Sequence, residues 1–105
     1  MDSEKEIYEI EFTQNAKDEI EEIYKYISEN LKNRDAAKRL MKKMRDNIMN
    51  LNKNPKIYMK VEIKRKIRKE FRRMVVNNYV ILYTVDEERK KVYISHMYYG
   101  KRNYL

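Results

Sequence analysis

The sequence predicts an α+β fold in which a helical hairpin lies on a small, mainly antiparallel sheet, with the elements in the order β-α-α-β-β-β. Three observations support this prediction. A period-two segment opens the chain, two segments with apolar residues every three or four positions follow, and the last third is rich in β-branched and aromatic residues. The 105 residues suffice for one domain and leave no room for a second. We therefore expect a single domain over residues 1–105.

The first strand is expected at residues 7–12, where apolar and polar side chains alternate. Thr13 or Asn15 then provides the N-cap of a helix of about five turns. The apolar residues of this helix form one stripe, which we expect to face the core: Ala16, Ile20, Ile23, Tyr24, Ile27 and Leu31.

A polar break at residues 30–34 separates this helix from a second one. Asp35 is the expected N-cap of the second helix, and Asn54-Pro55 closes the segment. Because the break is short, the two helices should form an antiparallel hairpin. The stripe of the second helix comprises Ala36, Leu40, Met41, Met44, Ile48 and Leu51.

Three further strands are expected in the last third, at residues 71–76, 79–85 and 92–99. Asn77-Asn78 makes the first turn between them, because asparagine tolerates left-handed backbone. Residues 79–83 are apolar without interruption, which is typical of a central strand covered on both faces. No conformation is predicted for residues 56–70, within a stretch (56–73) that carries nine bases and two acids.

Charge is distributed unevenly along the chain. Residues 1–30 carry ten acids and three bases, a net of −7, and residues 31–105 carry twenty-two bases and seven acids, a net of +15. The sum is the formal net charge of +8. This asymmetry favours nucleic acid or an acidic protein as partner. The alternative is that the lysines cover a solvated face without binding anything.

The composition limits which metal or cofactor sites the chain could form and where in the cell we expect it. The chain has no cysteine and one histidine, His96, so a zinc site is excluded and no cofactor is expected. There is no long apolar run for a membrane span, and Met1-Asp2-Ser3-Glu4 lacks the pattern of a signal peptide. We expect a cytoplasmic protein that does not interact with membranes.

Three phrases occur in a fixed order along the chain. Residues 10–13 read Ile-Glu-Phe-Thr at the end of the first strand, residues 78–86 read Asn-Tyr-Val-Ile-Leu-Tyr-Thr-Val-Asp, and residues 99–104 read Tyr-Gly-Lys-Arg-Asn-Tyr. Together, from Tyr8 to Tyr104, they resemble the RelE/ParE superfamily of toxins, the plasmid stabilisation proteins of type II toxin–antitoxin systems. The three motifs indicate the family more strongly than they indicate an activity within it.

The resemblance implies a protein that arrests growth until a cognate antitoxin neutralises it. RelE-like members cleave mRNA on the ribosome, whereas ParE-like members poison DNA gyrase and are not nucleases. It also implies a hetero-oligomer with the antitoxin, or a homodimer. If this chain is an enzyme, it is a metal-independent endoribonuclease; whether it is one stays open.

For RNA cleavage, cations must stabilise the pentacovalent phosphate and other groups must move protons. The candidate catalytic residues are Arg73, Arg102 and Tyr104, and the candidate nucleic-acid or target-binding residues are Arg72, Lys101 and Tyr99. Arg102 ranks first, because it matches the arginine of the family's closing motif. We expect Arg72 and Arg73 to form one basic cluster that converges with a second, Lys101 and Arg102. This takes the start of the first hairpin strand and the end of the last strand to lie at one end of the sheet.

Val80 departs from the nuclease pattern. RelE-like enzymes often carry an arginine directly after the tyrosine of the hairpin, where this chain has Val80. His96 is expected to make a structural hydrogen bond, with a role as general base as the alternative. Three hypotheses stay open: a protein-targeting toxin such as a gyrase poison, a ribosome-dependent endoribonuclease, and a non-toxic basic module that binds nucleic acid. Val80 favours the first over the second.

Overall fold

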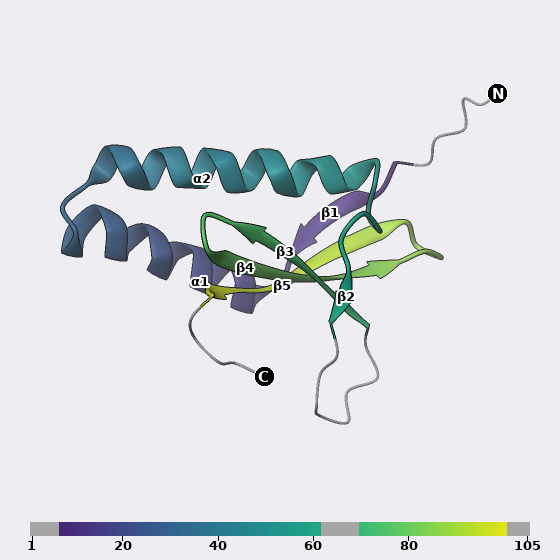
Figure 1. The fold of residues 1–105 in the computed structure, drawn as a ribbon. Helices are drawn as coiled ribbons and strands as arrows, with labels where there is room; N and C mark the ends of the chain where they lie inside the picture. Colours follow the sequence, from purple (N-terminus) through teal and green to yellow (C-terminus); the bar gives the residue numbers. More distant parts are fainter. Residues whose placement is uncertain (1–6, 62–69, 101–105) are drawn as a thin grey trace.

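The computed structural model describes residues 7–61 and 70–100, and it confirms the predicted α+β fold. Two antiparallel helices lie along one face of a five-stranded sheet with the order β1-β5-β4-β3-β2 (Figure 1). β1 runs parallel to β5, and the other neighbours are antiparallel. The elements are β1 (Glu9–Phe12), α1 (Gln14–Lys25), a π-helical turn (Tyr26–Asn30), α2 (Arg34–Met49), a 3-10 turn (Asn50–Asn52), β2 (Lys60–Val61), β3 (Phe71–Val76), β4 (Tyr79–Asp86) and β5 (Lys91–Tyr99).

The first helix begins at a threonine cap and ends in a π-helical turn. The Thr13 hydroxyl accepts a hydrogen bond from the backbone N–H of Ala16 at 3.2 Å, so Thr13 rather than Asn15 is the N-cap. In the turn, the N–H of Leu31 donates to the carbonyl of Tyr26 at 3.1 Å. This wider turn shifts the register of the stripe. Leu31 is therefore 56% exposed, and its predicted place in the core is wrong.

The N-cap of the second helix lies two residues before the predicted one. Asn33 is the N-cap, and its side-chain oxygen accepts from the N–H of Ala36 at 3.0 Å. Asp35 lies in the first turn instead, where the positive end of the helix dipole stabilises a carboxylate. The buried face comprises Ala37, Leu40, Met44 and Ile48, followed by Leu51 in the 3-10 turn. Among the described residues, no helix is long and apolar enough to cross a membrane.

β4 is the central strand of the C-terminal meander, as predicted. The turn before it places Asn77 and Asn78 at φ values of 49° and 70°, in the left-handed region that asparagine tolerates. Ile81 and Tyr83 are fully buried under the helices, and Val80 and Leu82 are 2% exposed on the opposite face. Both faces of β4 are thus covered.

Side chains of α1 satisfy the edge of β5 beyond the end of β1. The Thr13 hydroxyl donates to the carbonyl of Ser95 at 3.1 Å, and a carboxylate oxygen of Glu19 accepts from the N–H of Met97 at 2.8 Å. β1 pairs with β5 only as far as Ile94. Beyond that point, the side chains of Thr13 and Glu19 provide the hydrogen-bond partners along the edge of β5. They fix α1 against the sheet.

A buried hydrogen bond ties the segment after α2 to β4. The Tyr83 hydroxyl donates to the carbonyl of Pro55 at 2.8 Å. Burial raises the pKa of Tyr83 to about 12, because the charged phenolate loses its hydration. The neutral, donating form of Tyr83 is therefore the one that the fold stabilises.

Replacing Tyr83 by phenylalanine should lower the free energy of unfolding by about 1–3 kcal/mol, because the buried carbonyl of Pro55 loses its donor. Tyr99→Phe removes the same atom from a side chain that is 40% exposed and serves as the control. Urea unfolding at neutral pH, followed by circular dichroism, measures both. Equal stability of the two variants would contradict this role for the hydroxyl.

Alkaline pH should destabilise the wild type more than Tyr83→Phe. The pKa of Tyr83 rises from 10.0 in a free tyrosine to about 12 in the fold, so the unfolded chain loses this proton first. The resulting stability is fully present below pH 10 and disappears as the pH approaches 12, a loss on the order of 2–3 kcal/mol. Urea midpoints of both proteins across this range measure the difference. Parallel declines would show that Tyr83 does not contribute.

Replacing Glu19 by alanine should destabilise the protein by about 1–2 kcal/mol, because the Met97 N–H at the edge of β5 loses its acceptor. Glu19→Gln keeps an acceptor oxygen and should recover part of the loss. Glu21→Ala, on the exposed side of α1, is the control. Amide hydrogen exchange at Met97 provides a local readout, and unchanged protection in Glu19→Ala would show that this bond does not hold the edge.

Candidate target-binding face

One face of the sheet points away from the helices, and we call it the distal face. Side chains alternate between the faces of a strand, so cross-strand partners share a face. Arg73 pairs with Leu82, which pairs with His96, and these three form one row across β3, β4 and β5. A second row joins Val75 to Val80 and Tyr98. These six residues and Phe71 make up the middle of the distal face.

The centre of the distal face is apolar. Phe71, Val80, Leu82 and Tyr98 form a cluster separate from the main core, and each is at most 8% exposed. Val61 packs against this cluster from β2. Val80 therefore lies in an apolar environment, at the position where the resemblance to RelE-like enzymes led us to look for an arginine.

Charged and polar groups surround this centre. Arg73 is exposed, and the His96 side chain is 39% exposed with its ring 6.4 Å from that of Phe71, centroid to centroid. Nδ1 of His96 lies 3.7 Å from the Glu19 carboxylate, which is also bound to the Met97 N–H. Burial raises the pKa of Tyr98, and the nearby positive charge of Arg73 opposes that shift. The rim thus combines Arg73 and His96 with a carboxylate from α1.

No sequence pattern indicates that Glu19 belongs to this site. Its position predicts only an acidic residue near the start of a helix, and its partners Met97 and His96 are more than seventy residues away. The π-helical turn and the bulge between Leu82 and Tyr83 also fix the local geometry without a clear sequence signal. Folding alone brings these residues together.

The premise from which we predicted that two basic clusters converge is wrong, and the convergence itself stays a prediction. In a meander of three strands the third runs in the direction of the first, so the start of one and the end of the other lie at opposite ends. Arg72 lies across from Tyr83 and Ile94, whereas Tyr99 pairs with Tyr79 near the Asn77-Asn78 turn. Lys101, Arg102 and Tyr104 lie outside the described residues.

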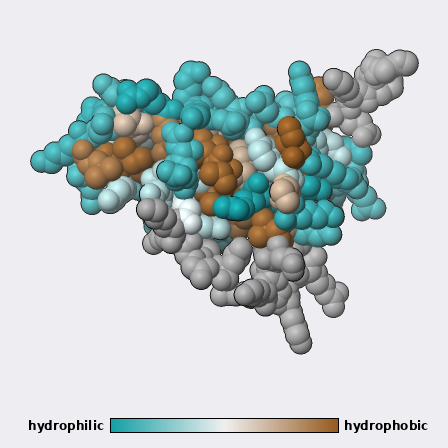
Figure 2. Space-filling model, viewed as in Figure 1, coloured by the Kyte–Doolittle hydropathy of each residue, from teal (hydrophilic) through white to brown (hydrophobic). Residues whose placement is uncertain are grey.

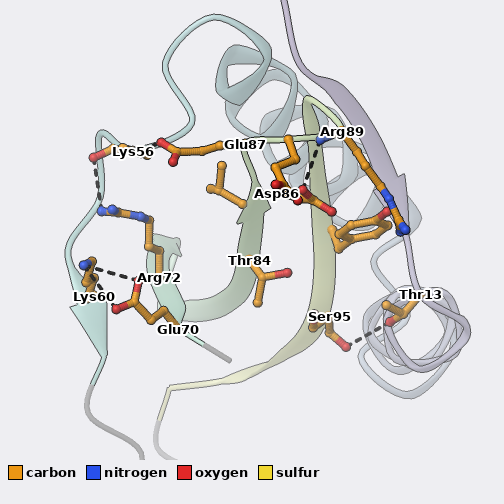
Figure 3. A pocket seen from close by; sticks show the side chains of 13 residues that line it. Thr13, Lys56, Lys60, Glu70, Arg72, Thr84, Asp86, Glu87, Arg89 and Ser95 are labelled. Atoms are coloured by element: carbon orange, nitrogen blue, oxygen red, sulfur yellow. Dashed lines mark hydrogen bonds and ion pairs between the residues drawn. The ribbon is translucent and has the colours of Figure 1, made fainter. Parts of the chain in front are cut away.

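Arg72 lies in a polar hollow of about 900 Å³ at the far end of the sheet (Figure 3). Its guanidinium donates to the carbonyls of Tyr58 at 2.7 Å and Lys56 at 3.3 Å, and so holds the segment after α2 against β3. Lys60 pairs with Glu70 beside it, and Lys56 with Glu87. These contacts give Arg72 a structural role; its contact with a target stays a prediction.

Gly100 closes β5 against the hairpin turn. Its N–H donates to the carbonyl of Asn78 at 2.6 Å. A Cβ atom at this position would lie 2.8 Å from that carbonyl oxygen, so a larger residue would push the strand end and the turn apart. The glycine of the closing motif thus fixes where the chain leaves the sheet.

An apolar groove of about 720 Å³ lies where α1 and its π-helical turn face the ends of β4 and β5. Tyr26, Leu31 and Tyr99 line it and are 52%, 56% and 40% exposed. Glu19 and Glu22 add negative charge to the lining. Figure 2 shows that apolar patches interrupt an otherwise hydrophilic surface over the helical hairpin and the strands.

Within residues 7–61 and 70–100, no three histidine, aspartate or glutamate side chains are placed to hold a metal ion. Of the predicted site residues, Arg73 lies at the rim of the distal face and Tyr99 lies in the apolar groove.

The fold matches solved structures of toxin–antitoxin systems. The chromosomal ParDE system of P. aeruginosa has a chain with a TM-score of 0.70 at 11% identity, covering 91% of this chain and 99% of that one. A chain of the RelBE2 complex of Mycobacterium tuberculosis has a TM-score of 0.61 at 17% identity, covering 89% of this chain and 98% of that one. A chain of the archaeal RelE–RelB complex of Pyrococcus horikoshii has a TM-score of 0.56 at 13% identity, covering 92% of this chain and 99% of that one. At these identities the likeness concerns the fold.

Sequence comparison identifies the family. No curated protein matches the chain. The family model of the ParE toxin of the type II toxin–antitoxin system parDE matches residues 10–104, which is most of the sequence and includes all three motifs. The chain belongs to the ParE toxin family within the RelE/ParE superfamily.

Proposed function

We propose that this protein arrests bacterial growth by inhibiting DNA gyrase in the cytoplasm, and that a cognate antitoxin neutralises it. Membership of the ParE family supports a toxin, and the three similar structures carry the names of toxin–antitoxin systems or complexes. The single observation that favours gyrase over mRNA as the target is the environment of Val80.

Val80 argues against RNA cleavage on the distal face. A phosphate placed there would leave water for the apolar surroundings of Phe71, Leu82 and Tyr98. Burial of an ion among apolar groups costs several kcal/mol unless a cation or donor compensates. Val80 provides neither, and among the described residues of the face Arg73 is the one arginine. The constellation that stabilises a cleaving phosphate is therefore weakened.

The apolar groove supports a protein target. Exposed aromatic and aliphatic side chains that gather in one place are typical of protein interfaces. Tyrosines also stack on RNA bases, but the carboxylates of Glu19 and Glu22 in the same groove repel phosphates. A groove lined by Tyr26, Leu31 and Tyr99 beside two acids thus suits a polypeptide better than a nucleic acid.

Purified protein should inhibit supercoiling of relaxed plasmid by gyrase, and its induction in cells should arrest growth without new mRNA 5′ ends on ribosomes. Leu31→Glu should reduce the inhibition at least about tenfold, because it places a charge in the apolar groove. Met49→Glu is the control, since Met49 is 45% exposed at the end of α2 and does not line the groove.

The competing function has a distinct signature. Codon-phased cuts in mRNA that vanish in Arg102→Ala and persist in Arg45→Ala, an exposed arginine of α2, would establish an endoribonuclease instead. Growth arrest that co-expression of the adjacent gene does not relieve would contradict the antitoxin. Normal growth on induction would contradict the toxin altogether.

A further inference from the structure

We propose that the apolar groove beside α1 binds a basic side chain of the partner protein, an arginine in preference to a lysine. Tyr26, Tyr79 and Tyr99 form an aromatic cage around its charge, and the carboxylate of Glu22 pairs with it. The groove is the surface through which the toxin is proposed to contact its target, so this assignment rests on the proposed function.

Two rings of the aromatic cage come from neighbouring strands. Tyr79 begins β4 and lies opposite Tyr99 at the end of β5. Their ring centroids are 5.5 Å apart and their planes meet at 68°, which is an edge-to-face arrangement. The edge of one ring then covers one face of the other, and the remaining faces stay available to a ligand. The two tyrosines thus form a corner with open aromatic faces.

The third ring comes from the π-helical turn. Tyr26 lines the same groove, and more than half of its side chain is exposed. Burial raises the pKa of Tyr79, and a charged Tyr99 or Tyr26 would raise it further. Tyr79 is therefore uncharged at neutral pH, and the three hydroxyls lie within electrostatic reach of one another. The fold alone brings this turn to the ends of the two strands.

A carboxylate completes the site. The N–H of Tyr26 donates to the backbone carbonyl of Glu22, four residues earlier, so the two side chains are neighbours on one face of the helix. Glu22 is exposed, and within residues 7–61 and 70–100 no cation pairs with it. The carboxylate of Glu19 already accepts the Met97 N–H and lies 3.7 Å from Nδ1 of His96. Glu22 is thus the carboxylate that a ligand can pair with.

The groove disfavours other kinds of side chain. An acidic side chain would meet the negative faces of the rings and two carboxylates. A purely apolar one would cover Glu22 without neutralising it, and desolvation opposes the burial of an unpaired carboxylate. A basic side chain pairs with the carboxylate and is attracted to the ring faces. Arginine is preferred, because its planar guanidinium stacks on rings and binds a carboxylate through two donors.

The charge around the groove strengthens this preference. α1 carries four acids and two bases, although the whole chain has a net charge of +8. The groove is therefore an acidic site on a basic protein, and it attracts a basic segment that the remaining surface repels. Ile23 and Leu31 also line the groove. A basic side chain between apolar neighbours is complementary to both parts of the lining.

A blocked peptide of the sequence Ala-Leu-Arg-Leu-Ala is a suitable probe, and its citrulline version keeps the shape without the charge. In NMR titrations of the full chain, the arginine peptide should shift the backbone amides of Tyr26, Leu31 and Tyr99 and saturate at millimolar concentration. The citrulline peptide should bind at least about tenfold more weakly, because it has no charge for the carboxylate and the rings. Equal affinity of the two peptides, or no shifts with the arginine peptide, would overturn the proposal.

Two pairs of variants separate charge and aromatic rings from the shape of the groove. Glu22→Gln should weaken binding of the arginine peptide at least about threefold, and Glu21→Gln, which removes the same charge outside the groove, should not. Tyr99→Leu should weaken it to a similar extent, whereas Tyr99→Phe keeps a ring face and should retain binding. Wild-type affinity in Glu22→Gln or in Tyr99→Leu would contradict the aromatic cage.

Supercoiling assays keep this test apart from that of the proposed function. Arginine-selective peptide binding by a chain that does not inhibit gyrase would support the site and contradict the target. Inhibition of gyrase that Leu31→Glu reduces and Glu22→Gln leaves unchanged would preserve the proposed function. That second result would overturn the basic side chain as the group that the groove receives from its target.

Discussion

β4 lies in the middle of the sheet with both of its faces removed from water, so each face requires its own apolar layer. The helical hairpin supplies the layer over Ile81 and Tyr83. On the other side, Val80 and Leu82 are covered within a smaller cluster that includes Phe71 and Tyr98. A strand buried in this way has no room for an unpaired charge, because desolvation would cost more than a single contact returns. The apolar character of the distal face follows from that constraint.

The same constraint explains how the surrounding elements are held. α1 reaches the edge of β5 through the Thr13 hydroxyl and the Glu19 carboxylate, which replace the strand that β1 no longer provides. The segment after α2 is held against the sheet by the hydroxyl of Tyr83 and the guanidinium of Arg72, which donate hydrogen bonds to its backbone carbonyls. Polar side chains thus complete the hydrogen bonding around a sheet whose centre is apolar.

Periodicity and turn chemistry predicted most of the fold, because these signals are local. The alternation at residues 9–12, the two helical stripes and the Asn77-Asn78 turn all correspond to observed elements. Leu31 was misplaced because a π-helical turn has no strong sequence signal, and β2 was not predicted because two residues carry no periodicity. The site was less predictable. Glu19 meets Met97 only through the tertiary fold, and the expected convergence of basic clusters ignored the direction of the third strand. The neighbourhood of Val80, in contrast, followed from the uninterrupted apolar run of β4.

The apolar, acid-flanked groove suits a protein target, and a direct comparison of binding tests this claim. The fluorescently labelled chain would be titrated with reconstituted DNA gyrase and, separately, with ribosomes carrying mRNA, at physiological salt. We expect saturable binding to gyrase that Leu31→Glu weakens and Met49→Glu does not, and only weak, salt-sensitive binding to ribosomes, as a net basic chain gives without a specific site. Saturable ribosome binding that persists at high salt, together with no binding to gyrase, would contradict the account.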